Sequence, residues 1–153
     1  MSAFVIAERV VKELAAGSFD FIVLNFANPD MVGHTGNHQA TIKACEAVDK
    51  ALGMIADAVL AVNGAMVITA DHGNAEEVKN LITGEMDKEH STNPVPCLIV
   101  AKALEGLRAP SGDVIGGDLS LNPPVGMLAD IAPTVLKLLG LEQPKDMTGQ
   151  PLV

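Results

Sequence analysis

Apolar side chains recur at helical spacing in two stretches of the chain, residues 5–16 and residues 39–62. Positions three and four apart lie on one face of an α-helix, so both stretches are predicted to form amphipathic helices. Gly17 follows the first stretch and Asn63-Gly64 follows the second. Glycine and asparagine tolerate the left-handed backbone that commonly ends a helix, so both predicted helices end at these residues.

Short apolar runs bounded by polar or turn-forming residues predict buried strands. These strands are expected at residues 19–26, 65–70 and 96–101. A later periodic stretch, residues 127–139, predicts a helix that ends at Gly140. Pro133 lies inside this stretch, where it would either kink the helix or occupy its first turn.

The alternation of predicted strands and helices indicates an α/β fold. Such an order is typical of a mostly parallel sheet with helices on both faces. The polar segments at residues 73–94 and 109–124 predict irregular loops, the second with short edge strands at most. Ligands of parallel sheets bind at the carboxyl ends of the strands, so the side chains that directly follow the strands are the first candidates for a binding site.

Three Asp/His signals fall just outside the predicted strands. Asp30 and His34 are four residues apart after the first strand, and a helical turn there would put both side chains on one face. Asp71 and His72 directly follow the second strand. Neighbouring side chains point in different directions, so this pair could serve two ions, or one ion if the backbone is irregular. His90 precedes the third strand, in a proline-stiffened loop.

Each of these signals has a plainer interpretation when taken alone. A single Asp and His four apart is common without any metal, and Asp-His-Gly is as often a turn as a site. His38 is interpreted as the start of the solvent face of the long helix, not as a ligand. Asn74, Glu76 and Glu77 most simply form the polar first turn of a short helix, where acidic groups suit the helix dipole. The convergence of three signals at one end of the predicted sheet favours a metal site, for which mixed Asp and His ligands suit zinc or manganese.

The composition narrows the classes of partner. Nineteen acidic and ten basic residues give a net charge of −9, which disfavours binding to nucleic acid. No apolar run is long enough to span a membrane, and no basic segment precedes an apolar one at the start, so a cytoplasmic protein is expected. Cys45 and Cys97 are far apart and are predicted to be buried, reduced thiols. Bound divalent cations would allow an acidic chain to accept an anionic substrate.

Several motifs together resemble those of the cofactor-independent phosphoglycerate mutases, a family of the alkaline phosphatase superfamily. The first is Asn-Pro-Asp-Met-Val-Gly-His-Thr-Gly-Asn, and the second is Ile-Thr-Ala-Asp-His-Gly-Asn-Ala-Glu. The resemblance runs nearly end to end and is carried by residues 28–37, 68–76, 90–96, 130–134 and 147–152.

This resemblance implies an alkaline-phosphatase-like fold and a role in glycolysis. The family interconverts 3-phosphoglycerate and 2-phosphoglycerate through a phosphoserine intermediate, with two divalent ions. Manganese is the expected metal, with zinc, magnesium and cobalt as alternatives. By motif, Asp30, His34 and His90 would hold the first ion, and Asp71 and His72 would supply part of the site for the second.

The chain departs from the family in what it lacks. Nothing in it matches the family's nucleophilic serine segment, its N-terminal Asp motif or its basic substrate-binding transferase domain, so no catalytic residue is assigned. Residues 1–153 are therefore expected to be a single partial domain with an incomplete sheet, binding one ion or none by itself and inactive alone. Expected partners are phosphoglycerate in an intact enzyme and either the missing N-terminal part or a second copy. The alternatives are a non-catalytic metal-binding or oligomerising fragment, and another phosphomutase or phosphatase of the superfamily.

Overall fold

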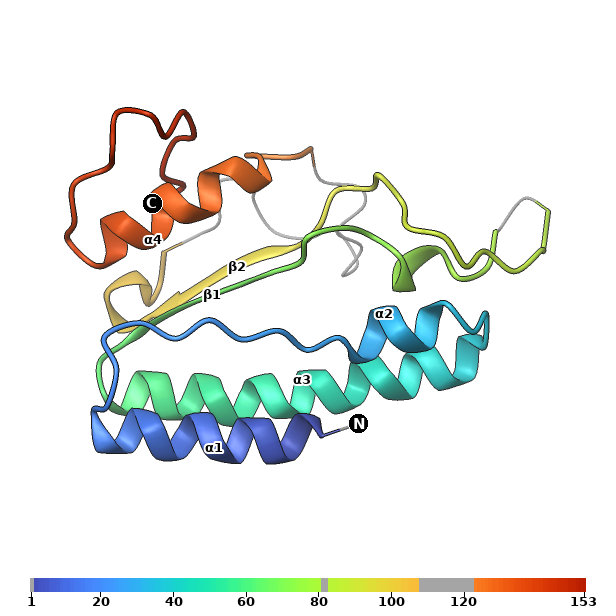
Figure 1. Ribbon diagram of the computed structural model, residues 1–153, viewed down its shortest axis with the longest axis horizontal. Coiled ribbons are helices and arrows are strands. Elements are labelled where there is room, and N and C mark those ends of the chain that lie inside the picture. Colours follow the sequence, from blue (N-terminus) through green and yellow to red (C-terminus); the bar gives the residue numbers. More distant parts are fainter. Residues whose placement is uncertain (1, 81–82, 108–122) are drawn as a thin grey trace.

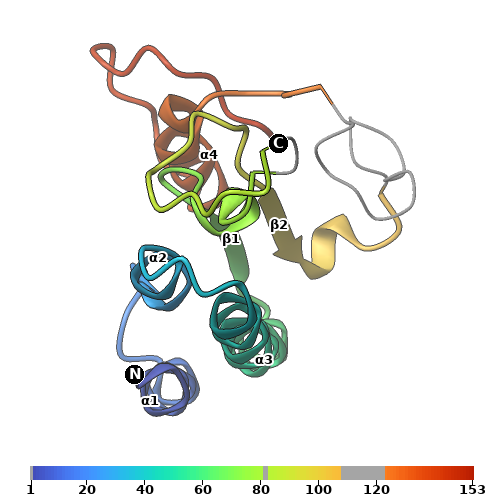
Figure 2. The ribbon, with the colours of Figure 1, turned by 90° about the vertical axis from the view of Figure 1, so that its right-hand side faces the viewer.

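The computed structural model describes residues 2–80, 83–107 and 123–153, and its elements are arranged in layers (Figure 1). Helices α1 and α3 lie side by side below a two-stranded sheet, and α4 lies on the other side of it (Figure 2). The α-helices are α1 (Ala3–Ala16), α2 (Asn28–Gly33), α3 (His38–Ala61) and α4 (Ile131–Leu138). The strands are β1 (Ala65–Thr69) and β2 (Cys97–Ala101), and the 3-10 helices are η1 (Ala75–Glu77), η2 (Lys102–Leu104) and η5 (Leu128–Asp130). No helix in the described part of the chain is long and apolar enough to cross a membrane.

The two long helices form as their periodicity predicts. Gly17 ends α1 with a φ of 61°, and Asn63 follows α3 with a φ of 56°. Both are left-handed conformations that β-branched residues strongly avoid. The side chain of Asn37 caps α3 by accepting a hydrogen bond of 3.1 Å from the backbone N–H of Ala40. Local sequence therefore sets the limits of both helices.

Small side chains bring α1 and α3 together. Ala7 and Ala51 are fully buried, and Ala3 is 2% exposed. Ile55 and Val59 complete the buried cluster. Because alanine projects little beyond the backbone, the two helices approach closely, and α2 and the two strands pack against α3.

The sheet differs from the expected one. The fold is α/β with helices on both faces, but β1 and β2 pair antiparallel, with Ala65 opposite Ala101 and Thr69 opposite Cys97. The predicted parallel order is wrong for this pair. Parallel neighbours need a crossover to the opposite end of the sheet, whereas residues 70–96 leave and return at the same end. Polar residues between two strands indicate a connection but do not reveal its direction.

The predicted strand at residues 19–26 is extended but joins no ladder among the described residues, so its assignment as a sheet strand is wrong here. Leu24 and Phe26 are partly buried and pack against the α1–α3 core. On the opposite side, Phe21 is 54% exposed and Val23 is 80% exposed. The predicted burial therefore holds for one side of the segment only, and a strand also needs a neighbour with free backbone groups.

The C-terminal helix begins with η5 and continues as α4, with Pro133 in the first turn of α4. Of the two interpretations of Pro133, the first-turn position is the one observed, since there its absent N–H has no helical partner to lose. The predicted loop at residues 109–124 falls almost wholly outside the described residues.

The prediction of buried thiols is wrong. Cys45 and Cys97 are both exposed, and neither forms a disulfide. Cys45 lies one position off the stripe of α3 that is buried, and Cys97 is the first residue of a strand that has one partner among the described residues. Partial desolvation still raises the pKa of both thiols, so both are protonated at neutral pH.

A buried carboxylate ties the C-terminal tail to α4. Asp130 is 6% exposed, and its oxygens accept hydrogen bonds of 2.8 Å from the backbone N–H groups of Met127 and Gln150. The Thr134 hydroxyl donates to the carbonyl of Asp130 and accepts from the N–H of Leu152. The hydrogen bonds from the backbone N–H groups of Met127 and Gln150, that of Met127 most strongly, hold the pKa of Asp130 below its usual value.

Replacement of this carboxylate should remove part of the acid sensitivity of the chain. A lowered folded pKa stabilises the folded state fully above about pH 4, and this contribution is lost as the pH falls through the folded pKa. In Asp130→Asn, the side-chain NH₂ group would also face the backbone N–H of either Met127 or Gln150, so two donors would meet. We expect a lower Tm than wild type at pH 7 and a difference that shrinks below pH 4, measured by circular dichroism. Asp146→Asn, at an exposed position of the same tail, is the control. An unchanged difference across this range would contradict the assignment.

Candidate metal centre

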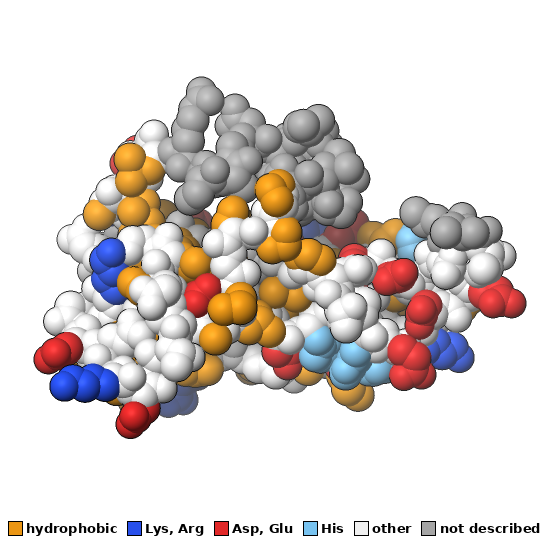
Figure 3. Space-filling model, turned by 90° about the horizontal axis from the view of Figure 1, so that it is seen from above, with side chains coloured by type: hydrophobic (Ala, Val, Ile, Leu, Met, Phe, Trp, Pro, Cys, Tyr) orange, Lys and Arg blue, Asp and Glu red, His pale blue; other side chains and the backbone are white. Residues whose placement is uncertain are grey.

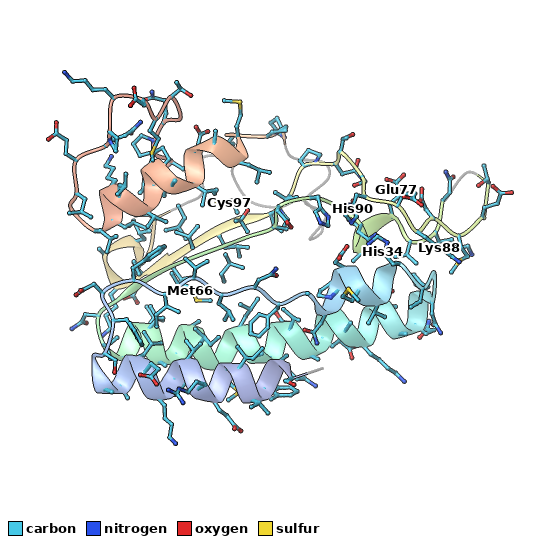
Figure 4. All side chains as sticks on the ribbon, in the orientation of Figure 1. His34, Met66, Glu77, Lys88, His90 and Cys97 are labelled. Atoms are coloured by element: carbon cyan, nitrogen blue, oxygen red, sulfur yellow. The ribbon has the colours of Figure 1, made fainter. Side chains whose placement is uncertain are left out.

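Three segments meet at one end of the sheet: α2, the loop after β1 and the loop before β2 (Figure 1). Their histidine side chains gather on one face of the molecule, next to acidic side chains (Figure 3). His34 and His90 lie beside each other there, with Lys88 nearby (Figure 4). His38 lies apart from this group, exposed at the start of α3, as the sequence suggested.

Helix α2 supplies the first two side chains. It starts with Asn28-Pro29, and proline suits a first helical turn because its fixed φ is already helical. Asp30 and His34 are then one turn apart, and Asp30 Oδ1 lies 3.2 Å from His34 Nε2. The prediction that a helical turn would put both side chains on one face is confirmed.

His90 reaches the same point from a loop 60 residues further along the chain. Its Nε2 atom lies 3.1 Å from Asp30 Oδ1 and 3.1 Å from His34 Nε2. One potential ligand atom from each of the three residues lies within 4.8 Å of the others. The side chains are a third to a half exposed, so solvent and small ligands can reach them.

A backbone carbonyl orients His34. The Nδ1 atom of His34 lies 2.5 Å from the carbonyl oxygen of Lys88, and a carbonyl only accepts, so Nδ1 carries the proton. In the neutral ring the lone pair is then on Nε2, which faces Asp30 and His90. Histidine ligands of metals usually have their second nitrogen held in this way. No motif in the sequence indicates this contact, because a backbone carbonyl is present at every residue.

Asp71 and His72 lie next to the first group. Their Oδ1 and Nε2 atoms are 3.6 Å apart, and the Asp71 side chain is 86% exposed. The ring of His72 stacks on that of His90, with centroids 3.7 Å apart and an angle of 17°. The structure thus joins the two predicted sets through an imidazole stack, while Asp71 faces solvent.

Glu76 links the loop after β1 to the loop before β2, next to His90. Residues Ala75–Glu77 form a short 3-10 helix, as their polar pattern indicated. The Glu76 carboxylate also accepts hydrogen bonds from the side chains of Ser91 and Asn93. Burial alone would raise the pKa of Glu76, but these hydrogen bonds and those from the backbone outweigh burial and lower its pKa. Sequence analysis missed this role, since a separation of 15 residues carries no periodic signal.

Gly33 allows α2 to touch the loop after β1. A Cβ atom at Gly33 would overlap the side-chain oxygen of Asn74. Asn74 is 5% exposed, and its amide donates a hydrogen bond of 3.1 Å to the carbonyl of Glu89. Its own Oδ1 has no hydrogen-bond partner among the described residues. Close packing without a side chain at Gly33 therefore positions Asp30 and His34 against the loop that carries His90.

A methyl group at this contact should be costly. We expect Gly33→Ala to destabilise the chain by about 1–3 kcal/mol, because α2 and Asn74 must move apart. Gly53→Ala is the matched control: Gly53 lies in α3 with no atom within 4 Å of an added Cβ. That change should instead stabilise the chain by about 0.5–1 kcal/mol. Denaturant unfolding measures both, and an equal gain for the two variants would refute the packing argument.

Comparison with known proteins places the chain in a family. A family model described as "Metalloenzyme superfamily" matches residues 1–143. A 2,3-bisphosphoglycerate-independent phosphoglycerate mutase of Clostridium perfringens is 47% identical over 149 residues, covering 97% of this chain and 27% of that protein. The enzyme of the same name from Clostridioides difficile is 44% identical over 153 residues, covering 100% of this chain and 28% of that protein.

A solved structure agrees with these relatives. A crystal structure of Leishmania mexicana phosphoglycerate mutase, obtained at low cobalt concentration, matches with a TM-score of 0.79 and 34% identity. The match covers 99% of this chain and 28% of the Leishmania chain. This likeness confirms the α/β fold class, although the sheet described here has two strands.

The chain belongs to the metalloenzyme superfamily. Within that class, its resemblance to the cofactor-independent phosphoglycerate mutases is confirmed by relatives of that name. It spans a little over a quarter of their length, 27% of the C. perfringens protein. Family membership and the Asp30, His34 and His90 group together support binding of a divalent metal.

Proposed function

We propose that this chain is the metal-binding part of a phosphoglycerate mutase. In this proposal Asp30, His34 and His90 hold one divalent ion, and Asp71 and His72 contribute to the site of a second. The supporting observation is the convergence of three ligand atoms within 4.8 Å, from a helix and from a loop about 60 residues away.

The donor set fits a borderline divalent ion. One carboxylate oxygen and two imidazole nitrogens suit manganese, zinc or cobalt better than magnesium, which prefers oxygen. Manganese is the metal we propose. The fixed tautomer of His34 adds support, since it leaves Nε2 free to donate its lone pair.

Bound ions at such a site would neutralise phosphoryl oxygens and lower the pKa of a coordinated hydroxyl. The residues of the chain prepare the site for this chemistry. Asp30 supplies a negative charge to both histidines, His72 supports the ring of His90 by stacking, and Asp71 extends into solvent, where a second segment can approach it. Phosphoglycerate is the proposed substrate of the whole enzyme, in the cytoplasm.

A nucleophile from another segment completes the proposal. Ser91 directly follows His90, and its hydroxyl donates a hydrogen bond to the carboxylate of Glu76, but the sequence around it does not resemble the family's nucleophilic segment. We therefore treat residues 1–153 as a single partial domain, to which an N-terminal segment and a substrate-binding domain would be added. The relatives are about four times as long, and this chain exposes apolar side chains that a neighbouring segment could cover.

That apolar surface lies between the extended segment at residues 19–26 and α4. A groove there is lined by Phe21, Leu128, Val135, Leu139 and Met147, among others. An unpaired extended segment beside an apolar groove can accept a further strand. The same surface favours the second candidate function, a module that binds metal and self-associates without catalysis; sedimentation would reveal a stable oligomer.

Metal binding is the first test. Titration calorimetry of the folded chain with Mn²⁺ should show binding. His90→Ala should weaken the affinity at least about 100-fold, because loss of a direct ligand should lower it at least as much as loss of a group that only orients a ligand. His38→Ala, an exposed histidine outside the cluster, should bind like wild type. Absence of binding to the folded wild-type chain would refute the proposed site.

Mutase activity is the second test. The chain alone, with Mn²⁺ and 3-phosphoglycerate, should form no 2-phosphoglycerate, because nothing in its sequence matches the family's nucleophilic serine segment. Phosphorus NMR of the mixture measures conversion directly. Conversion that is abolished by EDTA and by His90→Ala would overturn the view that another segment is required.

A further inference from the structure

We propose that Glu76 is a positioning residue that holds the His90 loop in the geometry needed for metal binding. The inference rests on the proposed metal site, and it concerns a residue outside the group of potential ligands. Glu76 acts on the backbone next to His90 and touches neither the metal nor a substrate.

The carboxylate of Glu76 joins the loop after β1 to the loop before β2. Its Oε1 atom accepts hydrogen bonds from the Ser91 hydroxyl and, at 3.1 Å, from the side-chain amide of Asn93. Its Oε2 atom accepts a hydrogen bond of 2.7 Å from the backbone N–H of Asn74. Three donors from two loops thus converge on one side chain, and Ser91 is the immediate neighbour of His90.

The backbones are also joined at this point. The N–H of Ser91 donates a hydrogen bond of 2.8 Å to the carbonyl of Gly73. A Cβ atom on Gly73 would overlap both Ser91 Oγ and Glu76 Oε1, so the carboxylate occupies space that only glycine leaves open. The position of His90 is therefore fixed from its C-terminal side by Gly73 and Glu76, independently of Asp30 and His34.

Charge and shape favour a glutamate at this position. All three partners are donors, and a carboxylate offers only acceptors. Glutamine has nearly the same shape, but its amide group would face at least one of these donors. Without these hydrogen bonds, the loop that carries His90 would be less restrained in the metal-free chain. The conformational entropy lost when the metal orders this loop would then oppose metal binding.

Glu77 provides a matched control. It is the next residue, belongs to the same 3-10 helix and carries the same charge. Its Oε2 atom accepts one hydrogen bond of 3.0 Å, from the Asn93 side chain, and no contact with Ser91 or Asn74 is recorded for it among the described residues. Glu77→Gln therefore removes one negative charge, as Glu76→Gln does, but it leaves the hydrogen bonds of Glu76 to Ser91, Asn93 and Asn74 in place.

The experiment compares Mn²⁺ affinity by calorimetry in the full chain for wild type, Glu76→Gln and Glu77→Gln. Glu76→Gln should bind about 10- to 100-fold more weakly, the usual range for groups that orient a ligand, and Glu77→Gln should change affinity less than about threefold. If wild type binds and both variants bind alike, the inference is wrong. If wild type does not bind, the proposed metal site fails instead.

A spectroscopic readout and a double variant show whether the effect passes through the ordering of the His90 loop. At saturating Co²⁺, the visible absorption of Glu76→Gln should match that of wild type, because the bound metal still recruits His90, whereas His90→Ala should differ, with one imidazole lost. In the His90→Ala background, Glu76→Gln should weaken binding no further, since both changes act on one contact. An independent, additive loss would overturn the assignment. Should Glu76→Gln fail to fold, Ser91→Ala tests the same tie and should weaken Mn²⁺ binding severalfold, whereas unchanged binding would refute it.

Discussion

The candidate site depends on the contact between α2 and the excursion that joins β1 to β2. Gly33 lies against Asn74, and the ring of His34 donates to the carbonyl of Lys88, 54 residues further along, so both contacts hold α2 to distant parts of the chain. Closing a loop of this length costs entropy that local contacts must offset. The polar ties around Glu76 add to these contacts, and they explain how an irregular loop can present His90 at a defined point.

The chain combines a high negative charge with exposed apolar side chains. A net charge of −9 would repel a phosphorylated acid, unless cations are bound where Asp30 and Asp71 lie. Meanwhile, exposed side chains such as Phe21 and Val23 leave one face of the extended segment uncovered. Both features support the proposal that the chain is part of a larger enzyme, in which metals would supply positive charge and another segment would cover the apolar face.

Much of the local structure could be predicted from sequence. Helices α1 and α3 follow from periodicity and from the residues that end them, and the turn that pairs Asp30 with His34 follows from their spacing. The grouping of these two residues with His90 was also expected, from the position of each motif and from family resemblance. The antiparallel pairing of β1 with β2 and the exposure of both cysteines were not predicted, because hydropathy does not encode strand direction or neighbours.

Sequence alone therefore determined the helices, the residue types of the site and the family. These depend on spacing along the chain and on the chemistry of single side chains. Only the tertiary structure decided which atoms meet: the carbonyl of Lys88 on His34, the ring of His72 on His90, and the carboxylate of Glu76 on the His90 loop. The physical reason is that such contacts join residues with no regular separation, so only the packing of α2 against the loops can bring them together.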